Sequence, residues 1–263
     1  MKKAQYLFFD IDGTLIYEGA KCLLESAKEA LRMAREKEHK IFINSGRTMC
    51  CLPPFLLEGF DGYLCGCGTN LYLDGREVLH VEIPAGIIRE IAQSAVKYNV
   101  HVIFEGKDAI YFAKKSMEHP LAQFWYNAYK AQGTNTVIYL PEDEIICSKF
   151  CVAAEEQSDM PAFLDTIAKD FETIDRGGSF FEVLPKGYSK STAMEVVLNF
   201  YGGVQEDTWA FGDSSNDLPM FQFAKHTVAM GQHDTVLEEC AEFIADTVEN
   251  DGLYKIMRQQ GLI

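Results

Sequence analysis

Two carboxylates, Asp10 and Asp12, stand two residues apart, directly after the apolar run 6–9 and directly before a Gly-Thr turn. The run has the composition of a buried β-strand, and the carboxyl end of such a strand is where ligands bind in an open α/β sheet. One carboxylate placed there can attack a phosphorus atom while the other transfers a proton. A solvated turn rich in Asp and Gly would have the same sequence pattern, so the two carboxylates alone could equally belong to a turn without catalytic function.

Two further segments carry groups that can hold a phosphoryl group. The apolar run 40–43 leads to Ser45 and Gly46, whose hydroxyl and backbone amide can bind a phosphate oxygen. Lys190 stands at the start of an apparent helix, where its ammonium can neutralise phosphoryl charge. Seen alone, a Ser-Gly pair after a strand is more often a turn, and a lone lysine at a helix start is more often solvated.

An acidic cluster follows the apolar run 208–211 and contains Asp213, Asn216 and Asp217. Oxygen ligands of this kind suit Mg²⁺, a hard cation that keeps several waters and takes one or two protein carboxylates. Asp217 could instead cap or orient the helix that begins near it. Four such segments in this order, three of them at the ends of apolar runs, favour a phosphoryl-transfer site over four unrelated turns.

The four motifs together resemble those of the haloacid dehalogenase superfamily of phosphohydrolases, and the resemblance covers essentially the whole chain. The long insertion between the second and third motifs is similar to the α/β cap of the Cof-type branch, subfamily IIB. The resemblance implies an α/β fold with a Rossmann-like, doubly wound parallel-sheet core and an inserted α/β cap that selects the substrate. The core would comprise residues 1–83 and 186–263, and the cap residues 84–185.

The resemblance also implies a role for each motif residue. Asp10 would be the nucleophile that forms an aspartyl phosphate, and Asp12 would protonate the leaving oxygen and then activate water. Mg²⁺ would be bound by the side chains of Asp10 and Asp213 and by the backbone carbonyl of Asp12. Asp217 would lie behind them, holding waters or Lys190. The residues around the phosphoryl group would be Ser45, Gly46 through its amide, Lys190 and Asn216.

Two residues outside the core of the motifs are weaker candidates for substrate contact. Arg47 follows the Ser-Gly pair and can reach a substrate oxygen or form a surface salt bridge. In the run 180–184, strand alternation puts Glu182 on one sheet face, where it can bond a sugar hydroxyl or pair with a lysine.

Composition narrows the classes of partner. The chain has 263 residues, long enough for two lobes, and its formal net charge of -15 argues against a nucleic-acid or anionic-membrane surface, since both need a basic patch. No stretch approaches the ~20 apolar residues of a membrane span. The first residues run straight into a strand without the apolar core of a signal peptide, so we expect a cytoplasmic protein.

The 8 cysteines and 6 histidines show no metal-ligand spacing. Most of the cysteines are expected to be buried, reduced thiols. Cys67 is the exception, because its loop should lie near the crevice. It is also where this chain departs from the family pattern, with Cys67-Gly68-Thr69 in place of the common Asn-Gly-Ala.

The secondary-structure pattern predicts a parallel core sheet and a separate cap sheet. Core strands are expected at 6–9, 40–43, 62–65 and 208–211, with a hairpin through Asp74-Gly75. Between Pro84 and Pro185 we expect an antiparallel sheet, with strands at 101–105, 109–113 and 147–153, a closing hairpin across 176–178, and helices at 85–98, 119–131 and 160–169. In the helix 119–131 the apolar spacing predicts a buried face made of Leu121, Phe124, Trp125, Ala128 and Tyr129, and leaves Tyr126 for solvent or a partner.

The sequence therefore predicts a Mg²⁺-dependent phosphomonoesterase that acts on a small phosphorylated metabolite, such as a sugar phosphate or a related cofactor. A sugar phosphomutase of the same superfamily is the nearest alternative, since it would return the phosphoryl group to the sugar rather than to water. A phospho-accepting signalling domain also joins an Asp cluster, a hydroxyl residue and a lysine, but such domains are typically far shorter and lack a cap-like insertion.

Overall fold

In the computed structural model, which describes residues 3–17, 19–141 and 143–263, the chain divides into two units. The core unit consists of Met1–Gly46, Pro53–Leu79 and Tyr188–Ile263. The cap unit consists of His80–Gly187 together with the short segment Arg47–Leu52. No helix among the described residues is long and apolar enough to cross a bilayer.

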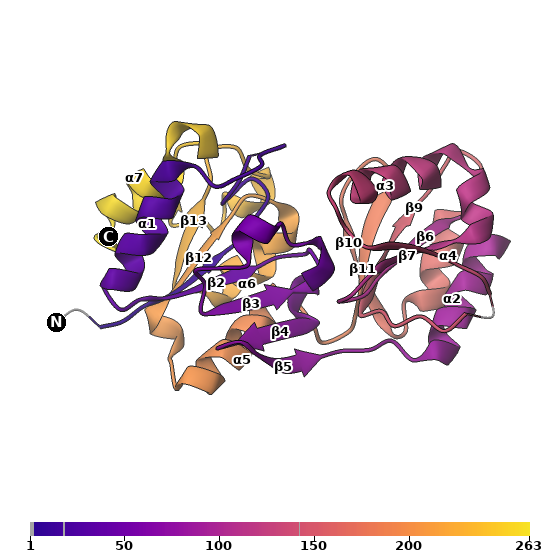
Figure 1. The fold of residues 1–263 in the computed structure, drawn as a ribbon, viewed down its shortest axis with the longest axis horizontal. Coiled ribbons are helices and arrows are strands. Elements are labelled where there is room, and N and C mark those ends of the chain that lie inside the picture. Colours follow the sequence, from indigo (N-terminus) through magenta and orange to yellow (C-terminus); the bar gives the residue numbers. More distant parts are fainter. Residues whose placement is uncertain (1–2, 18, 142) are drawn as a thin grey trace. The chain divides into compact units, whose positions relative to one another are not determined.

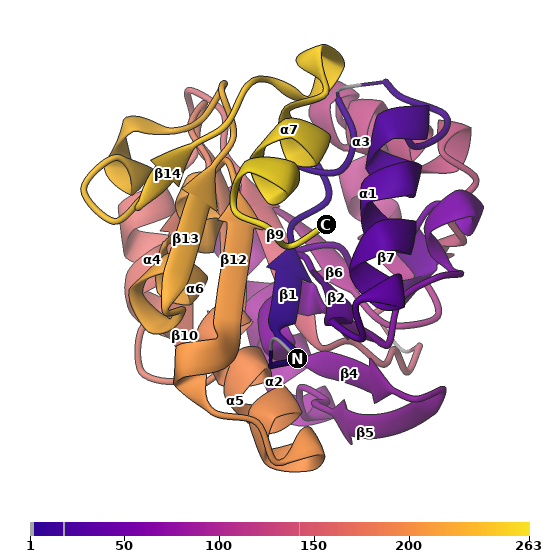
Figure 2. The same cartoon turned by 90° about the vertical axis from the view of Figure 1, so that its left-hand side faces the viewer.

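The core unit is built on an eight-stranded sheet with the order β14-β13-β12-β1-β2-β3-β4-β5 (Figure 1 and Figure 2). From β14 to β3 all neighbours pair in parallel, and β4 pairs antiparallel with β3. This confirms the α/β class with a parallel-rich main sheet, which β13 and β14 extend beyond the strands expected from the sequence. The strands are β1 (Tyr6–Phe9), β2 (Lys40–Asn44), β3 (Gly62–Cys65), β4 (Asn70–Leu73), β5 (Arg76–His80), β12 (Thr208–Gly212), β13 (His226–Ala229) and β14 (Phe243–Ile244).

Both faces of the core sheet are buried, which is why its central strands read as continuous apolar runs. On one face Phe8 and Phe42 belong to a core cluster that α5 (Lys190–Tyr201) and α6 (Leu218–Phe223) complete. On the other face Leu7 is equally buried. The helices α1 (Glu25–Glu36) and α7 (Gly252–Gln259) lie side by side (Figure 2).

The cap unit has its own six-stranded sheet, with the order β10-β11-β9-β6-β7-β8. Its neighbours pair antiparallel as expected, except that β8, a strand that was not predicted, pairs in parallel with β7. The expectation of an antiparallel cap sheet was therefore wrong at this one strand. The strands are β6 (His101–Glu105), β7 (Ile110–Ala113), β8 (Thr136–Tyr139), β9 (Lys149–Ala153), β10 (Phe171–Asp175) and β11 (Phe180–Pro185).

Two helices, α2 (Ala85–Lys97) and α4 (Met160–Ile167), pack on one face of this sheet, and α3 (Pro120–Ala131) packs on the other. The predicted buried face of α3 needs correction, because the Phe124 side chain is 62% exposed. Ala122 is buried instead, and Tyr126 packs edge-on against Phe112 with ring centroids 5.4 Å apart. The helix is therefore rotated toward the side that Tyr126 occupies, since the sheet offers aromatic surface there.

Candidate active site

The acidic motifs come together because the strands that precede them are neighbours in a parallel sheet. β1 lies between β12 and β2, and Phe9 is in register with Phe211 on one side and with Ile43 on the other. The Asp10 amide continues the ladder and donates to the Phe211 carbonyl at 2.9 Å. Asp10 and Asp213 follow directly after their strands, so both lie at the carboxyl edge of the sheet.

Three carboxylates converge at this edge. Oxygens of Asp10, Asp213 and Asp217 lie within 4.8 Å of one another, and Asp217 is fully buried. Burial, opposed by Lys190 and reinforced by neighbouring carboxylates, raises the pKa of Asp10 to about 7. Burial and the nearby charges of Asp10 and Asp217 raise the pKa of Asp213 to about 8. The cluster thus carries more negative charge than its protein surroundings neutralise, which is the environment that a divalent cation stabilises.

A single buried ammonium bridges two of these carboxylates. The Nζ atom of Lys190 lies 2.7 Å from Asp10 Oδ1 and 2.5 Å from Asp217 Oδ1, and its side chain is fully buried. Burial opposes the charged form, but the two carboxylates outweigh it and raise the pKa of Lys190. The ammonium therefore stays charged at neutral pH and is held at a fixed point beside Asp10.

The position of Lys190 follows from how its helix begins. Ser189 is the N-cap of α5 and forms a capping box with Thr192, so Lys190 is the first helical residue. The backbone carbonyl of Lys190 also accepts a hydrogen bond from Asn44 Nδ2 at 2.9 Å, although Asn44 belongs to β2. Sequence reasoning missed Asn44, and the available signal was a polar residue at the end of an otherwise apolar strand.

Both carboxylate oxygens of Asp217 bind groups of the protein. Oδ1 contacts Lys190, and Oδ2 accepts from the backbone amides of Asp213 and Ser214 at 2.9 and 3.0 Å. Gly212 makes this approach possible, because a Cβ there would lie 2.6 Å from the Asp217 carboxyl carbon. Asp217 therefore fixes both the lysine and the turn that carries Asp213.

The Gly-Thr turn after Asp12 closes over Asp213. Gly13 has φ +80°, and a Cβ there would lie 2.3 Å from Asp213 Oδ2. The Thr14 hydroxyl donates to Asp213 Oδ1 at 3.1 Å, a contact that sequence reasoning did not anticipate. Only glycine fits at position 13, since both the backbone conformation and the space exclude a side chain.

Ser45 and Asn216 are both buried in the core unit. The backbone of Ser45 is fixed on two sides, since its amide donates to the Leu64 carbonyl at 2.8 Å and its carbonyl accepts from the Cys67 amide at 3.0 Å. The Asn216 side-chain oxygen accepts from the Ser214 hydroxyl at 3.0 Å. Gly46 follows Ser45 and is partly exposed.

Three of the predicted site residues are not members of the buried cluster of carboxylates and lysine. Asp12 is exposed to solvent. Arg47 is grouped with the cap unit, and its guanidinium donates to the Cys51 carbonyl at 3.0 Å. Glu182 lies on β11 and is buried in an ion pair with Lys149, which also contacts Glu105 at 3.2 Å.

The Cys67 loop reaches the start of α5. Cys67 is buried and has the left-handed conformation with φ 52°, which asparagine adopts more readily than cysteine. Gly68, also at positive φ, approaches so closely that a Cβ would lie 2.4 Å from the Ser189 carbonyl oxygen. The Gly turn of the family pattern is thus required here, while the hydrogen bonds of an asparagine side chain at position 67 are absent.

The chain matches a known protein family over nearly its whole length. A model described as haloacid dehalogenase-like hydrolase matches residues 7–257. The chain is 27% identical to the Bacillus subtilis protein YkrA over 99% of both chains. It is 26% identical, over 98% of both chains, to YitU of the same organism, a 5-amino-6-(5-phospho-D-ribitylamino)uracil phosphatase.

Comparison with solved structures supports the same family. The subclass IIB sugar phosphatase BT4131 superimposes with a TM-score of 0.83 at 26% sequence identity, and the match covers 99% of this chain and all of BT4131. The likeness therefore includes both units.

Proposed function

Because the chain belongs to the haloacid dehalogenase-like hydrolases, and is a phosphatase of small phosphorylated metabolites, we propose that Asp10 is its nucleophile and that the reaction requires Mg²⁺. The observation that carries the proposal is the buried arrangement in which Lys190 contacts Asp10 at 2.7 Å while Asp213 lies beside it. Such a site works by positioning and charge neutralisation, because a loose phosphoryl transition state leaves little other covalent chemistry for the protein.

Asp10 is the best candidate for attack among the three clustered carboxylates. Both oxygens of Asp217 are occupied by Lys190 and by backbone amides. Asp213 is held by the Thr14 hydroxyl and lies under Gly13. Among the described residues, the Asp10 side chain is bound by Lys190 at Oδ1, which leaves its other oxygen as the one to attack phosphorus. The product of that attack is an aspartyl phosphate, which water then hydrolyses.

The residues present fit a divalent cation. Carboxylate oxygens of Asp10 and Asp213, with the Asp12 backbone carbonyl, form an all-oxygen donor set of the kind that Mg²⁺ prefers. When bound, the ion would neutralise the excess negative charge of the cluster and polarise the phosphoryl group. Asp217 would support this set by holding the turn after β12.

The remaining roles follow from exposure and from the local backbone. Asp12 is exposed two residues after Asp10, so it can protonate the leaving oxygen and later take a proton from water. The Ser45 hydroxyl, the Gly46 amide, Lys190 and Asn216 would surround the phosphoryl oxygens. The Ser45 backbone is fixed by the two hydrogen bonds described above, which preorganises that side of the site.

The cap unit would select the substrate, which we propose is a sugar phosphate or a related phosphorylated metabolite. The relatives support this class, since one is a sugar phosphatase and another acts on a phosphorylated ribityl compound. Arg47 and Glu182, both in the cap unit, remain the candidate substrate contacts. The buried pairing of Glu182 with Lys149 means that a substrate hydroxyl would have to join an existing ion pair there.

Phosphate release from a panel of phosphorylated metabolites, with and without Mg²⁺, tests the proposal. Asp10→Asn should abolish turnover with the fold intact, because only one oxygen becomes nitrogen at a strand end. Asp12→Asn should slow the reaction and leave phosphoenzyme detectable after acid quench with a good leaving group. Asp246→Asn, at an exposed ion pair with Lys255, is the matched control and should keep wild-type activity. Retention of more than a few per cent of activity by Asp10→Asn would refute the assignment.

A further inference from the structure

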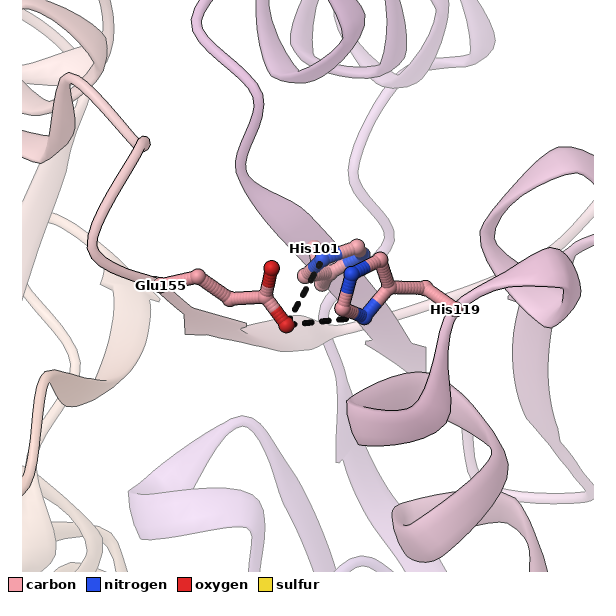
Figure 3. Close-up of side chains that lie close together, drawn as sticks. All are labelled: His101, His119 and Glu155. Atoms are coloured by element: carbon pink, nitrogen blue, oxygen red, sulfur yellow. Dashed lines mark ion pairs between the residues drawn. The ribbon is translucent and has the colours of Figure 1, made fainter.

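The cap unit contains a second cluster of metal-ligating side chains, which has no part in the phosphatase chemistry above. His101, His119 and Glu155 each offer a ligand atom within 4.8 Å of the others. Figure 3 shows the two imidazole rings next to each other, with the Glu155 carboxylate facing both. All three residues belong to the cap unit.

The fold of the cap unit brings the three together although they are far apart in sequence. His101 opens β6 and is in register with Ala153 of β9, and Glu155 lies just beyond Ala153. His119 is the N-cap residue of α3. The cluster therefore joins the start of one strand, the segment after its antiparallel neighbour, and the beginning of a helix.

The distances suit a shared cation. His119 Nδ1 lies 2.8 Å from Glu155 Oε1, and His101 Nε2 lies 4.0 Å from the same oxygen. The two ring centroids are 4.6 Å apart. With metal–nitrogen and metal–oxygen bonds of about 2.0–2.2 Å, a tetrahedral site needs ligand atoms ~3.3–3.6 Å apart, between the two separations in the structure. Each of the two separations differs from that spacing by less than about 1 Å.

The main evidence for a bound ligand is the environment of the His101 Nε2 atom. His101 is only 8% exposed, and its buried Nε2 has no hydrogen-bond partner within the part of the chain that the structure describes. A buried ring nitrogen with neither donor nor acceptor is uncommon, because such a group loses its water and gains nothing in return. Burial and the neighbouring His119 lower the pKa of His101, so the ring is neutral at pH 7 and its nitrogen lone pair is free to coordinate.

Helix capping and ion pairing explain only part of the cluster. The His119 Nδ1 atom accepts from the Leu121 amide at 3.4 Å, which is too long for a strong cap. A His119–Glu155 pair by itself would account for these two side chains. It would leave the buried His101 nitrogen unexplained, and it would give no reason for a second imidazole to face the same carboxylate.

We propose that His101, His119 and Glu155 form a binding site for a transition-metal ion of the Zn²⁺ class. Two imidazole nitrogens and one carboxylate oxygen are a borderline donor set that selects Zn²⁺ and its neighbours over Mg²⁺. The His119 and Glu155 side chains are 38% and 27% exposed, so an ion can enter from solvent and keep a water as its fourth ligand. Bound there, the metal cross-links β6, the start of α3 and the segment after β9.

Zinc titration of tag-free, chelator-stripped protein tests the site, with excess Mg²⁺ present to occupy the aspartates of the core unit. One equivalent of Zn²⁺ should bind per chain, and His101→Gln, His119→Gln and Glu155→Gln should each raise Kd by at least about tenfold. His226→Gln is the matched control, because His226 pairs with Glu242 at 2.7 Å without a second imidazole, and its Zn²⁺ binding should equal wild type.

Imidazole ¹⁵N spectra identify the ligands directly. Two of the 6 rings should shift on addition of Zn²⁺, and His101→Gln and His119→Gln should each remove one of these signals. Circular dichroism confirms that each variant is folded, and the partly exposed Glu155→Gln carries the test if the buried His101→Gln does not fold. Absence of stoichiometric binding overturns the proposal, as does binding that persists unchanged in His119→Gln and Glu155→Gln, which would locate the ion elsewhere.

Discussion

Lowering the pH from 8 to 6 should weaken Mg²⁺ binding at the proposed site between the Asp10 and Asp213 carboxylates. In the metal-free protein the pKa of Asp10 is raised to about 7 and that of Asp213 to about 8, chiefly by burial. Both values exceed those of the unfolded chain, so the fold holds protons at these positions that the cation must displace. Mg²⁺ affinity should therefore reach its limit only above about pH 9 and be lost as the pH falls through 8 and then 7.

The size of the effect follows from proton competition. If only the Asp213 proton competes, the affinity at pH 6 is lower than at pH 8 by about 50-fold, and if both protons compete independently, by about 500-fold. Because the two carboxylates interact, the measured factor should lie between these values. Because both carboxyl groups have a higher pKa in the folded state, the folded protein without Mg²⁺ binds more protons than the unfolded chain between about pH 4 and pH 8. Its free energy of unfolding should therefore decrease as the pH rises through this range.

Isothermal titration calorimetry with Mg²⁺ at pH 6, 7 and 8 measures this directly. Repeating the titration at pH 7 in two buffers with different protonation enthalpies gives the number of protons released, which should be about one per ion. Asp246→Asn removes an exposed carboxylate and should reproduce the wild-type profile. An affinity that does not change between pH 6 and 8, or binding without proton release, would refute the proposed origin of the raised pKa values.

Three substitutions test other parts of the structure. Gly13→Ala places a Cβ 2.3 Å from Asp213 Oδ2 at φ +80°, so calorimetry should find Mg²⁺ affinity reduced at least about tenfold. Lys149→Met removes the cation between two buried carboxylates and should lower the free energy of unfolding in urea by ~3–5 kcal/mol, whereas Lys255→Met at an exposed pair should change it by less than ~1 kcal/mol. Phe124→Ser should change the free energy of unfolding by less than ~0.5 kcal/mol, because the ring is exposed. A loss of several kcal/mol, as for a core residue, would show that Phe124 lies on the buried face of α3 as the sequence predicted.

The fold class and the family could be predicted from the sequence because their signals are local. Each core strand is a short apolar run, and the chemistry-bearing residues stand at the next position along the chain, where strand direction alone determines which edge of the sheet they reach. Asp10, Asp213, Asp217 and Lys190 lie together in the structure, while the catalytic roles given to them remain predictions.

Other features depend on contacts between distant segments, which local pattern does not encode. Strand β8 is short, and its apolar residues Val137 and Ile138 are exposed, so its place in the cap sheet is decided by pairing with β7 rather than by burial. The rotation of α3 is decided by Phe112 and its neighbours on the sheet, not by the helix itself. The cluster of His101, His119 and Glu155 has no sequence signature, because it forms only when β6 pairs with β9 and α3 begins beside them.

The strand order of the core sheet also determines when the active site can first exist during synthesis. Strand β1 needs β12 as its neighbour, and Tyr6 pairs with Thr208, so the sheet is incomplete until the last quarter of the chain has been made. The segment His80–Gly187 carries all six strands of the cap sheet and emerges earlier. At the ~5–20 residues per second of translation, the first core strands wait on the order of ten seconds for their partner. During that interval Asp10 has neither Lys190 nor Asp213, and the apolar edge of β1 is a surface that a chaperone would protect.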